Sequence, residues 1–228
     1  MKIYKTDETL IGECKENELN KWCEEHKADL RGISLQCVAI KKCNMCRANL
    51  YEANLCGINL HGIDLCGADL RSVNLYGAKL YEVDLRGADL RLAYLCGAEL
   101  YEVDLRGADL RGAYIEGAEL KGVDMRGADL RRSDISRVNL GRTNLQKANI
   151  EDAEIDFSCL PLSCSSLTMI TDERQRIQIM YHWASLIANA KIITQEEINI
   201  YNSILKYANK MHRADVPKLV ELLNDEKI

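Results

Sequence analysis

A five-residue period runs through most of the chain. Leu, Ile or Met occupies every fifth position from Leu30 to Leu160, giving 27 consecutive positions with 20 Leu, 5 Ile and 2 Met. Two positions before each of these core residues stands a small or β-branched residue, most often Ala. Two positions after them stand 12 of the chain's 14 glycines. A fixed short period of this kind predicts a repeat architecture.

The period excludes regular helices, which repeat about every 3.6 residues, and alternating strands, which repeat at about every second residue. A chain that turns a corner at each repeat fits it, with the core residue and the small residue pointing inwards and the other three outwards. The Gly-rich position then lies in the turn, because glycine tolerates turn dihedral angles. The near-copies 79–98 and 99–118 add a 20-residue period, and four sides of one repeat each close a square. We therefore predict a solenoid of square coils, stacked at the strand spacing of about 4.8 Å.

These repeats resemble the pentapeptide-repeat family, whose motif reads A(D/N)LXX. The motif occurs here as ADLRG, ANLCG and VDLRG, and the repeats cover roughly 130 of the 228 residues. The resemblance implies a mainly β fold, a right-handed quadrilateral β-helix. The handedness comes from the resemblance alone.

The period divides the chain into four regions. Residues 1–27 lie outside it and are predicted to form an N-terminal cap, with short strands over 2–6 and 9–14 and a helix over 16–26; a partner-binding arm is the alternative. Residues 28–160 form the β-helix, about six and a half to seven turns, and residues 161–171 form a Ser-rich linker. Residues 172–228 show helical periodicity and predict a C-terminal helical cap.

The predicted C-terminal helices carry more apolar surface than one coil end needs. This surplus, together with the C-terminal helices of similar proteins, predicts a homodimer through this region. The candidate self-association residues are Tyr181, Trp183, Ile187, Tyr201 and Leu205.

Outward residues recur once in every coil and so form columns of like side chains. Two neighbouring sides are each expected to carry a column of Asp beside a column of Arg. We term these paired columns the charge ladders. They include Asp89 with Arg91, Asp109 with Arg111, and Asp104 with Arg106. Exposed ion pairs contribute only about 0–1 kcal/mol each. The ladders are therefore expected to serve solubility and to oppose edge association.

Tyrosines mark the other two sides. Tyr76, Tyr94 and Tyr114 are predicted on one side, and Tyr81 and Tyr101 on its neighbour, with Tyr51 near a corner. Exposed Tyr is favoured at protein interfaces, so these residues form a candidate partner surface. The alternative is that Tyr pairs in adjacent coils only stabilise the stack.

The sequence offers no enzyme signature. It has no Gly-rich phosphate loop, HExxH or nucleophile elbow, and its four histidines share no predicted face. Cys43 and Cys46 spell CxxC, but the register points one inwards and the other outwards. Cys46 and Cys66 are expected to stack in adjacent coils as free thiols within disulfide reach. We expect no catalytic residues, metal or cofactor.

The net charge of −5 predicts neither direct nucleic-acid binding nor membrane binding. The N-terminal residues lack an apolar signal segment, and we expect a cytoplasmic protein.

The favoured function is a non-enzymatic scaffold for an unidentified protein partner. The resemblance also implies an alternative, a DNA mimic that binds DNA gyrase or topoisomerase IV and modulates quinolone sensitivity. However, residues 28–160 hold 17 Lys and Arg against 20 Asp and Glu, which is too balanced to imitate a phosphate backbone. An enzyme site in the C-terminal region is a third possibility.

Overall fold

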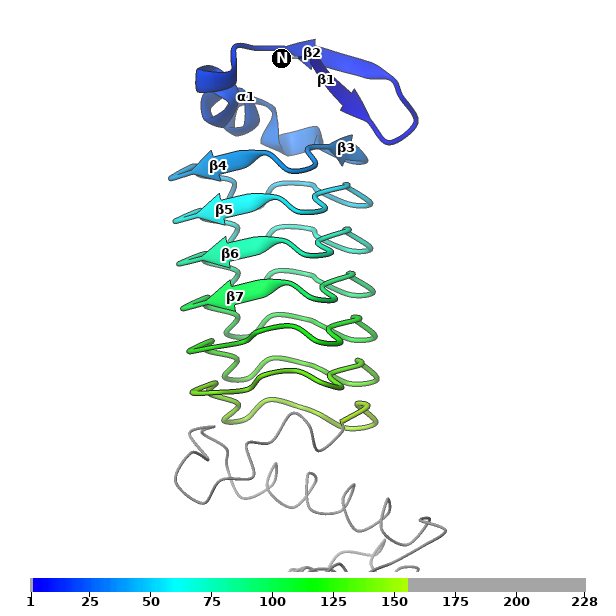
Figure 1. Ribbon diagram of the computed structural model, residues 1–228, viewed down its shortest axis with the longest axis vertical. Helices are drawn as coiled ribbons and strands as arrows, with labels where there is room; N and C mark the ends of the chain where they lie inside the picture. Colours follow the sequence, from blue (N-terminus) through cyan, green and yellow to red (C-terminus); the bar gives the residue numbers. More distant parts are fainter. Residues whose placement is uncertain (1, 156–228) are drawn as a thin grey trace, which may run out of the picture. The chain divides into compact units, whose positions relative to one another are not determined.

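The computed structural model describes residues 2–155, an N-terminal hairpin and helix followed by stacked coils (Figure 1). One side of the stack is a parallel sheet of four short strands in chain order: β4 (Ala39–Lys41), β5 (Asn59–His61), β6 (Lys79–Tyr81) and β7 (Glu99–Tyr101). Ile40 lies beside Leu60, Leu60 beside Leu80, and Leu80 beside Leu100. Paired residues in adjacent coils are therefore one full coil apart in the sequence, as the near-copies predicted.

The other three sides pair with the same register through isolated parallel bridges. One side runs from Asn44 to Asn144, the next from Asn49 to Asn149, and the last from Ser34 to Glu154, each in steps of one coil. Backbone hydrogen bonds join successive coils at these bridges, as where Leu50 N–H donates to Asp69 O at 2.8 Å and Asp69 N–H donates to Ala48 O at 2.9 Å. These pairings confirm the predicted repeat β-helix and give each coil four sides.

The core consists of the residues that the period points inwards. From Leu30 to Ile150 every residue of the five-residue series is buried, and the small residues from Ala48 to Ala153 are buried beside them. Two of these small positions are polar, and each hydroxyl donates to a backbone carbonyl: Ser133 Oγ to Leu130 O at 2.7 Å, and Thr143 Oγ1 to Leu120 O at 2.6 Å. Burial of these hydroxyls therefore leaves neither donor unsatisfied.

The corner after each core residue has left-handed backbone geometry. Every residue two positions after a core residue, from Gly32 to Asp152, has a φ between 50° and 74°. Glycine adopts this conformation without steric cost, which explains its recurrence at these corners. Thirteen corners carry another residue, among them Leu92 with a φ of 58°.

The N-terminal region covers the first coil. Strand β1 (Lys2–Lys5) pairs antiparallel with β2 (Leu10–Glu13) and with β3 (Ile33–Ser34) of the first coil. The predicted helix begins as a 3-10 turn, η1 (Glu16–Glu18), and continues as α1 (Leu19–His26). The predicted strands and the buried face of Leu19, Trp22 and Cys23 are confirmed.

Contacts of α1 with the coils explain how this cover is held. Asn20 Nδ2 donates to Lys41 O, and Asn44 N–H donates to Glu24 Oε1 at 2.7 Å. The Trp22 ring packs so closely on Gly12 that a Cβ added to this glycine would lie 2.9 Å from the ring. The absence of a side chain at Gly12 therefore lets the hairpin lie directly against α1. These contacts hold α1 and the hairpin together and join α1 to the coil that contains Lys41 and Asn44.

The prediction was wrong at the start of the repeat. Residues Lys27–Asp29 form a second 3-10 turn, η2, and Ala28, which the register pointed inwards, is exposed. Leu30 is the first buried residue of the series. The helix that precedes it occupies the chain up to His26, so no flat coil side can form before Leu30.

Other predictions remain open. The predicted end of the β-helix, the linker over 161–171 and the helical cap over 172–228 lie outside the described residues. The right-handed sense of the coil stays a prediction. Within residues 2–155, no helix combines the length and apolar character that a membrane crossing requires.

The inward register makes Leu105, which is 1% exposed, intolerant of charge. We expect Leu105→Asp to bury an unpaired carboxylate in mid-stack and to cost about 4 kcal/mol or more. Thermal unfolding followed by circular dichroism should show a large drop in Tm. Tyr76→Asp, at a side chain that is 61% exposed, is the control and should leave the Tm nearly unchanged.

Candidate functional site

The Asp or Asn that precedes most core residues holds the corner of the coil. Asp69 Oδ1 accepts a hydrogen bond from Arg71 N–H at 3.2 Å, and Asn49 Oδ1 accepts the equivalent bond from Tyr51 N–H at 3.3 Å. A short side-chain oxygen that bonds the backbone two positions further on is typical of Asx turns. The sequence prediction placed these residues only in outward columns and missed this hydrogen-bonding role. The recurrence of Asp and Asn at the same position of the repeat could have indicated it.

The charge ladders are continuous along two sides of the stack. Arg91 donates to Asp89 through Nε at 2.8 Å and through Nη2 at 2.6 Å, and its Nε lies 3.6 Å from Asp109 Oδ2 in the next coil. The same arrangement is made by Arg71 and Arg111 on this side and by Arg86 and Arg106 on the neighbouring one. Arg131 and Arg126 end the two ladders and pair with the aspartate of their own coil, because the next coil carries Asn149 and Asn144. The structure thus brings the residues of the two ladders together.

The arginines lie outermost in both ladders. Their side chains are 40–49% exposed, whereas the partner aspartates are 27–29% exposed. The carboxylates are held inwards because they also accept the corner N–H. Each ladder therefore presents guanidinium groups to solvent with carboxylates behind them.

The arginines also keep the aspartates ionised. Hydrogen bonds from Arg71 and Arg86 hold the pKa of Asp69 and of Asp84 below the usual value, and Arg126 and Arg131 do the same for the pKa of Asp124 and of Asp129. At Asp109, burial opposes this effect, but the hydrogen bonds from Arg111 outweigh it and the pKa is lowered. Groups held in this state are poor proton donors at neutral pH.

The largest exposed apolar side chains of the coils lie along one side of the stack and at the two corners that border it. Tyr76, Leu92, Tyr94 and Tyr114 are 43–61% exposed and come from three successive coils; we name this set the apolar corner. The rings of Tyr94 and Tyr114 stack with centroids 5.0 Å apart. In the rest of the described chain, only Tyr4 and Leu10 of the hairpin are large, apolar and comparably exposed. Sequence periodicity found the tyrosines but missed Leu92.

Tyr81 and Tyr101 lie on a different side and are more enclosed. Their rings stack with centroids 5.3 Å apart, and Tyr81 Oη donates to Glu99 Oε2 at 2.7 Å. This hydrogen bond raises the pKa of Tyr81. Both tyrosines line a shallow groove of about 480 Å³ with His61, Glu82, Glu102, Lys121, Gly122 and Arg142. Their contacts fit a role in joining adjacent coils.

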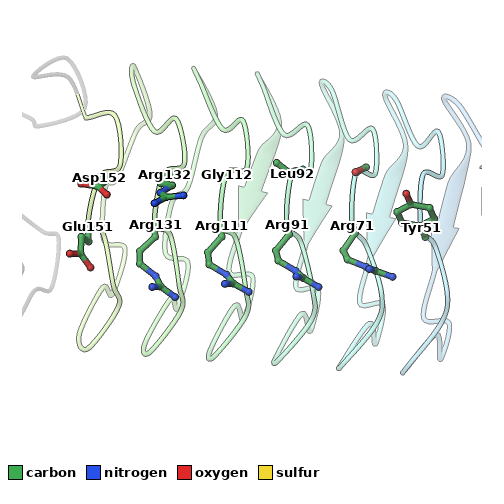
Figure 2. Close-up of a pocket in the computed structure, with 11 residues that line it drawn as sticks. Tyr51, Arg71, Arg91, Leu92, Arg111, Gly112, Arg131, Arg132, Glu151 and Asp152 are labelled. Carbon is green, nitrogen blue, oxygen red and sulfur yellow. The ribbon is translucent and has the colours of Figure 1, made fainter.

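A larger groove follows the arginine ladder that borders the apolar corner (Figure 2). Its volume is about 710 Å³, and Tyr51 lies at one end of the row of arginines and Glu151 and Asp152 at the other. The Arg71 guanidinium carbon lies 5.1 Å from the centre of the Tyr51 ring, a cation–π contact. Ser72, Leu92 and Gly112 also line the groove.

The cysteines of residues 2–155 form no disulfide. Cys43 is buried and Cys46 half-buried, as the register predicted. Burial raises the pKa of both Cys23 and Cys43 to about 12, so neither is a reactive thiolate at neutral pH. In the same part of the chain, His, Cys, Asp and Glu nowhere gather in a group of three suited to a metal ion. The candidate self-association residues in 172–228 lie outside the described residues.

Sequence comparison places these features in a family. The family model described as pentapeptide repeats matches residues 48–87, 88–127 and 124–156, with eight copies. The chain belongs to the pentapeptide-repeat family. The match falls on the coils whose core and corners are described above. Among curated proteins, none matches this pentapeptide-repeat protein.

Solved structures of pentapeptide-repeat proteins resemble the chain. One from the thylakoid lumen of Arabidopsis thaliana is 32% identical over 41% of this chain and 65% of its own length, just under two thirds, with a TM-score of 0.40. One from Nostoc PCC 7120 is 33% identical over 46% of this chain and 75% of its own, with a TM-score of 0.21. QnrB1, a plasmid-mediated fluoroquinolone resistance protein, is 17% identical over 65% of this chain and 89% of its own, with a TM-score of 0.26.

Substitutions at Asp109 separate the corner hydrogen bond from the ion pairs. Asp109→Asn keeps an oxygen for the Arg111 N–H, as Asn149 does one coil beyond Asp129, and should cost less than about 1 kcal/mol. Asp109→Ala removes both interactions and should cost about 1–2 kcal/mol more than Asn. Chemical denaturation of the three proteins measures this difference. Equal costs for Asn and Ala would show that the corner bond contributes nothing.

The lowered pKa values predict acid sensitivity. A carboxyl group whose folded pKa is depressed stabilises the fold fully above its unfolded pKa, about 3.9, and loses this contribution as the pH falls through the folded value. We expect the Tm to stay level from pH 7 to about pH 5 and to fall below about pH 4. Arg111→Gln, which removes a partner of both Asp109 and Asp129, should show a shallower acid-induced fall. An identical pH profile would contradict the assignment.

Proposed function

We propose that this pentapeptide-repeat protein is a non-enzymatic, cytoplasmic scaffold that binds a protein partner through the apolar corner. The observation that carries the proposal is the concentration of Tyr76, Leu92, Tyr94 and Tyr114 in three successive coils. Elsewhere the outward positions of the described coils are mainly charged or small. Exposed Tyr beside Arg is the composition typical of interface hot spots.

The proposed architecture has two further parts. The β-helix is right-handed, as the family resemblance implies, and the chain forms a homodimer through residues 172–228. Both rest on the sequence.

Tyr94 and Tyr114 replace the Asp or Asn that most repeats carry at this position. Tyr94 and Tyr114 stand in the column where Asn54 and Asn74 accept the corner N–H of Cys56 and Tyr76, at 3.2 and 3.0 Å. Tyrosine has no oxygen close enough to its backbone to make this bond. The two coils thus forgo a stabilising contact and gain exposed aromatic area, as expected where binding is favoured over stability.

The alternative of a DNA mimic has less support from the geometry. A surface that imitates DNA needs its carboxylates outermost, because phosphate oxygens form the outer edge of the duplex. In both ladders the guanidinium groups lie outside the carboxylates, as their exposed fractions show. The two ladder sides, in which each guanidinium is paired with a carboxylate, lack the outermost negative charge that a DNA-binding surface would recognise.

The proposal can be tested with a double variant that suits the fold. Tyr94→Asn with Tyr114→Asn restores the corner hydrogen bonds and should leave the Tm equal or higher. A photo-crosslinking amino acid at Leu92 should capture a protein partner in cells, and the double variant should reduce capture by about tenfold or more, since loss of hot-spot residues costs over about 1 kcal/mol each.

The control is Tyr101→Lys, which matches Lys121 in the equivalent position of the next coil. It should leave capture unchanged because Tyr101 lies on another side. Capture that survives the double variant, or capture that depends on Tyr101, would contradict the proposed surface.

A further inference from the structure

The groove beside the apolar corner joins two surfaces of different chemistry. The arginine ladder lines it in one row and the line of corners that contains Leu92 lines it in a second, parallel row, as Figure 2 shows. The labelled arginines Arg71, Arg91, Arg111 and Arg131 extend in parallel from successive coils. Between Tyr51 at one end and Glu151 and Asp152 at the other, an occupant of the groove meets a row of cations and one aliphatic side chain.

The arginines retain hydrogen-bonding capacity towards the groove. Each uses Nε and Nη2 for the aspartate of its own coil, at 2.6–2.9 Å. Among the described residues, Nη1 of these four arginines makes no hydrogen bond to another group. A guanidinium held by a carboxylate on one edge is oriented to donate from the other, and carboxylates are its preferred acceptors.

Leu92 lines the groove in a strained backbone conformation. It adopts a φ of 58° and is 53% exposed, whereas the corners before and after it in the same column carry Ser72 and Gly112. A left-handed conformation is unfavourable for a residue with a Cβ, and least suited to a bulky apolar one. Its Cδ2 lies 3.0 Å from where a Cβ on Gly112 would stand, so the side chain covers the neighbouring glycine corner. Strain of this kind at an exposed apolar residue points to binding.

We propose that this groove binds an extended acidic segment of a partner protein, with carboxylates on the arginine ladder and an aliphatic side chain against Leu92. The inference rests on the proposed scaffold function and specifies its partner. The four arginines span three coil spacings, about 14 Å, which an extended peptide covers with about four to five residues at about 3.3 Å each. The apolar corner continues from Leu92 onto the next side and holds the remainder of the partner.

A single-stranded nucleic acid is a poorer match for the same row of cations. Such ligands need an open aromatic face on which a base can stack. The facing sides of Tyr94 and Tyr114 are closed by their mutual stacking at 5.0 Å. The Tyr51 ring is covered by Arg71.

The test is fluorescence anisotropy with defined probes and the full chain. The main probe is a fluorescein-labelled peptide of sequence EEDLEEDE. A peptide with Ser in place of Leu, a peptide with Lys in place of every acidic residue, and an eight-nucleotide oligothymidylate are the comparison probes. We expect saturable binding of the main probe, weaker binding of the Ser peptide, and none of the Lys peptide or the oligonucleotide.

Two pairs of matched variants locate the site. Leu92→Gly relieves the left-handed strain and should raise the Tm while weakening the main probe by about tenfold. Glu102→Gly relieves the same strain at a corner of the other groove, with a φ of 54°, and should raise the Tm without changing binding. Arg111→Gln should weaken the probe by about tenfold, and Arg106→Gln, in the other ladder, by no more than about twofold.

Other outcomes would overturn the inference. These are no binding of the main probe, binding that Leu92→Gly and Arg111→Gln leave unchanged, and equal or tighter binding of the oligonucleotide. If crosslinking at Leu92 still captures a partner while the acidic peptide fails to bind, only the acidic chemistry is refuted. If crosslinking fails as well, the scaffold function is refuted with it.

Discussion

A left-handed corner in every repeat is the constraint on which the coils depend. The backbone takes this conformation at each corner from Gly32 to Asp152, whatever residue stands there. Because the corners are equally spaced, each side pairs with the same side of the next coil, and the core residues stack in continuous columns. The hydrogen bonds from the corner N–H to Asp and Asn reinforce the same geometry from outside. Core, pairing and surface thus share one period.

This shared period turns single residues into surfaces. An outward residue has its counterpart in the next coil as its neighbour, so similar residues one coil apart become the arginine ladders and the stacked tyrosines. Departures from the repeat are equally visible, since Leu92 stands between Ser72 and Gly112 in an otherwise small or charged column. The candidate site is therefore found where the repeat is least regular.

Much of the fold could be predicted because the period is strict. The buried register, the four sides, the ladders and the two tyrosine sides all follow from counting in fives. The prediction was wrong at Ala28, where the geometry of the preceding helix overrides the repeat. The groove and the role of Leu92 could not be predicted, because they depend on which side chain leans over which corner. The outer position of the arginines depends likewise on the aspartates being held by the corner N–H.

The corner bond has an evolutionary consequence. Asn and Asp supply the same oxygen to the backbone, as Asn49 and Asp69 do in adjacent coils, although only one of them is charged. A single exchange between them alters the electrostatic field of a side while the turn beneath it keeps its bond. Surface charge in such a protein can drift or be selected almost independently of folding. One framework can in this way acquire partners of opposite charge without rebuilding its interior.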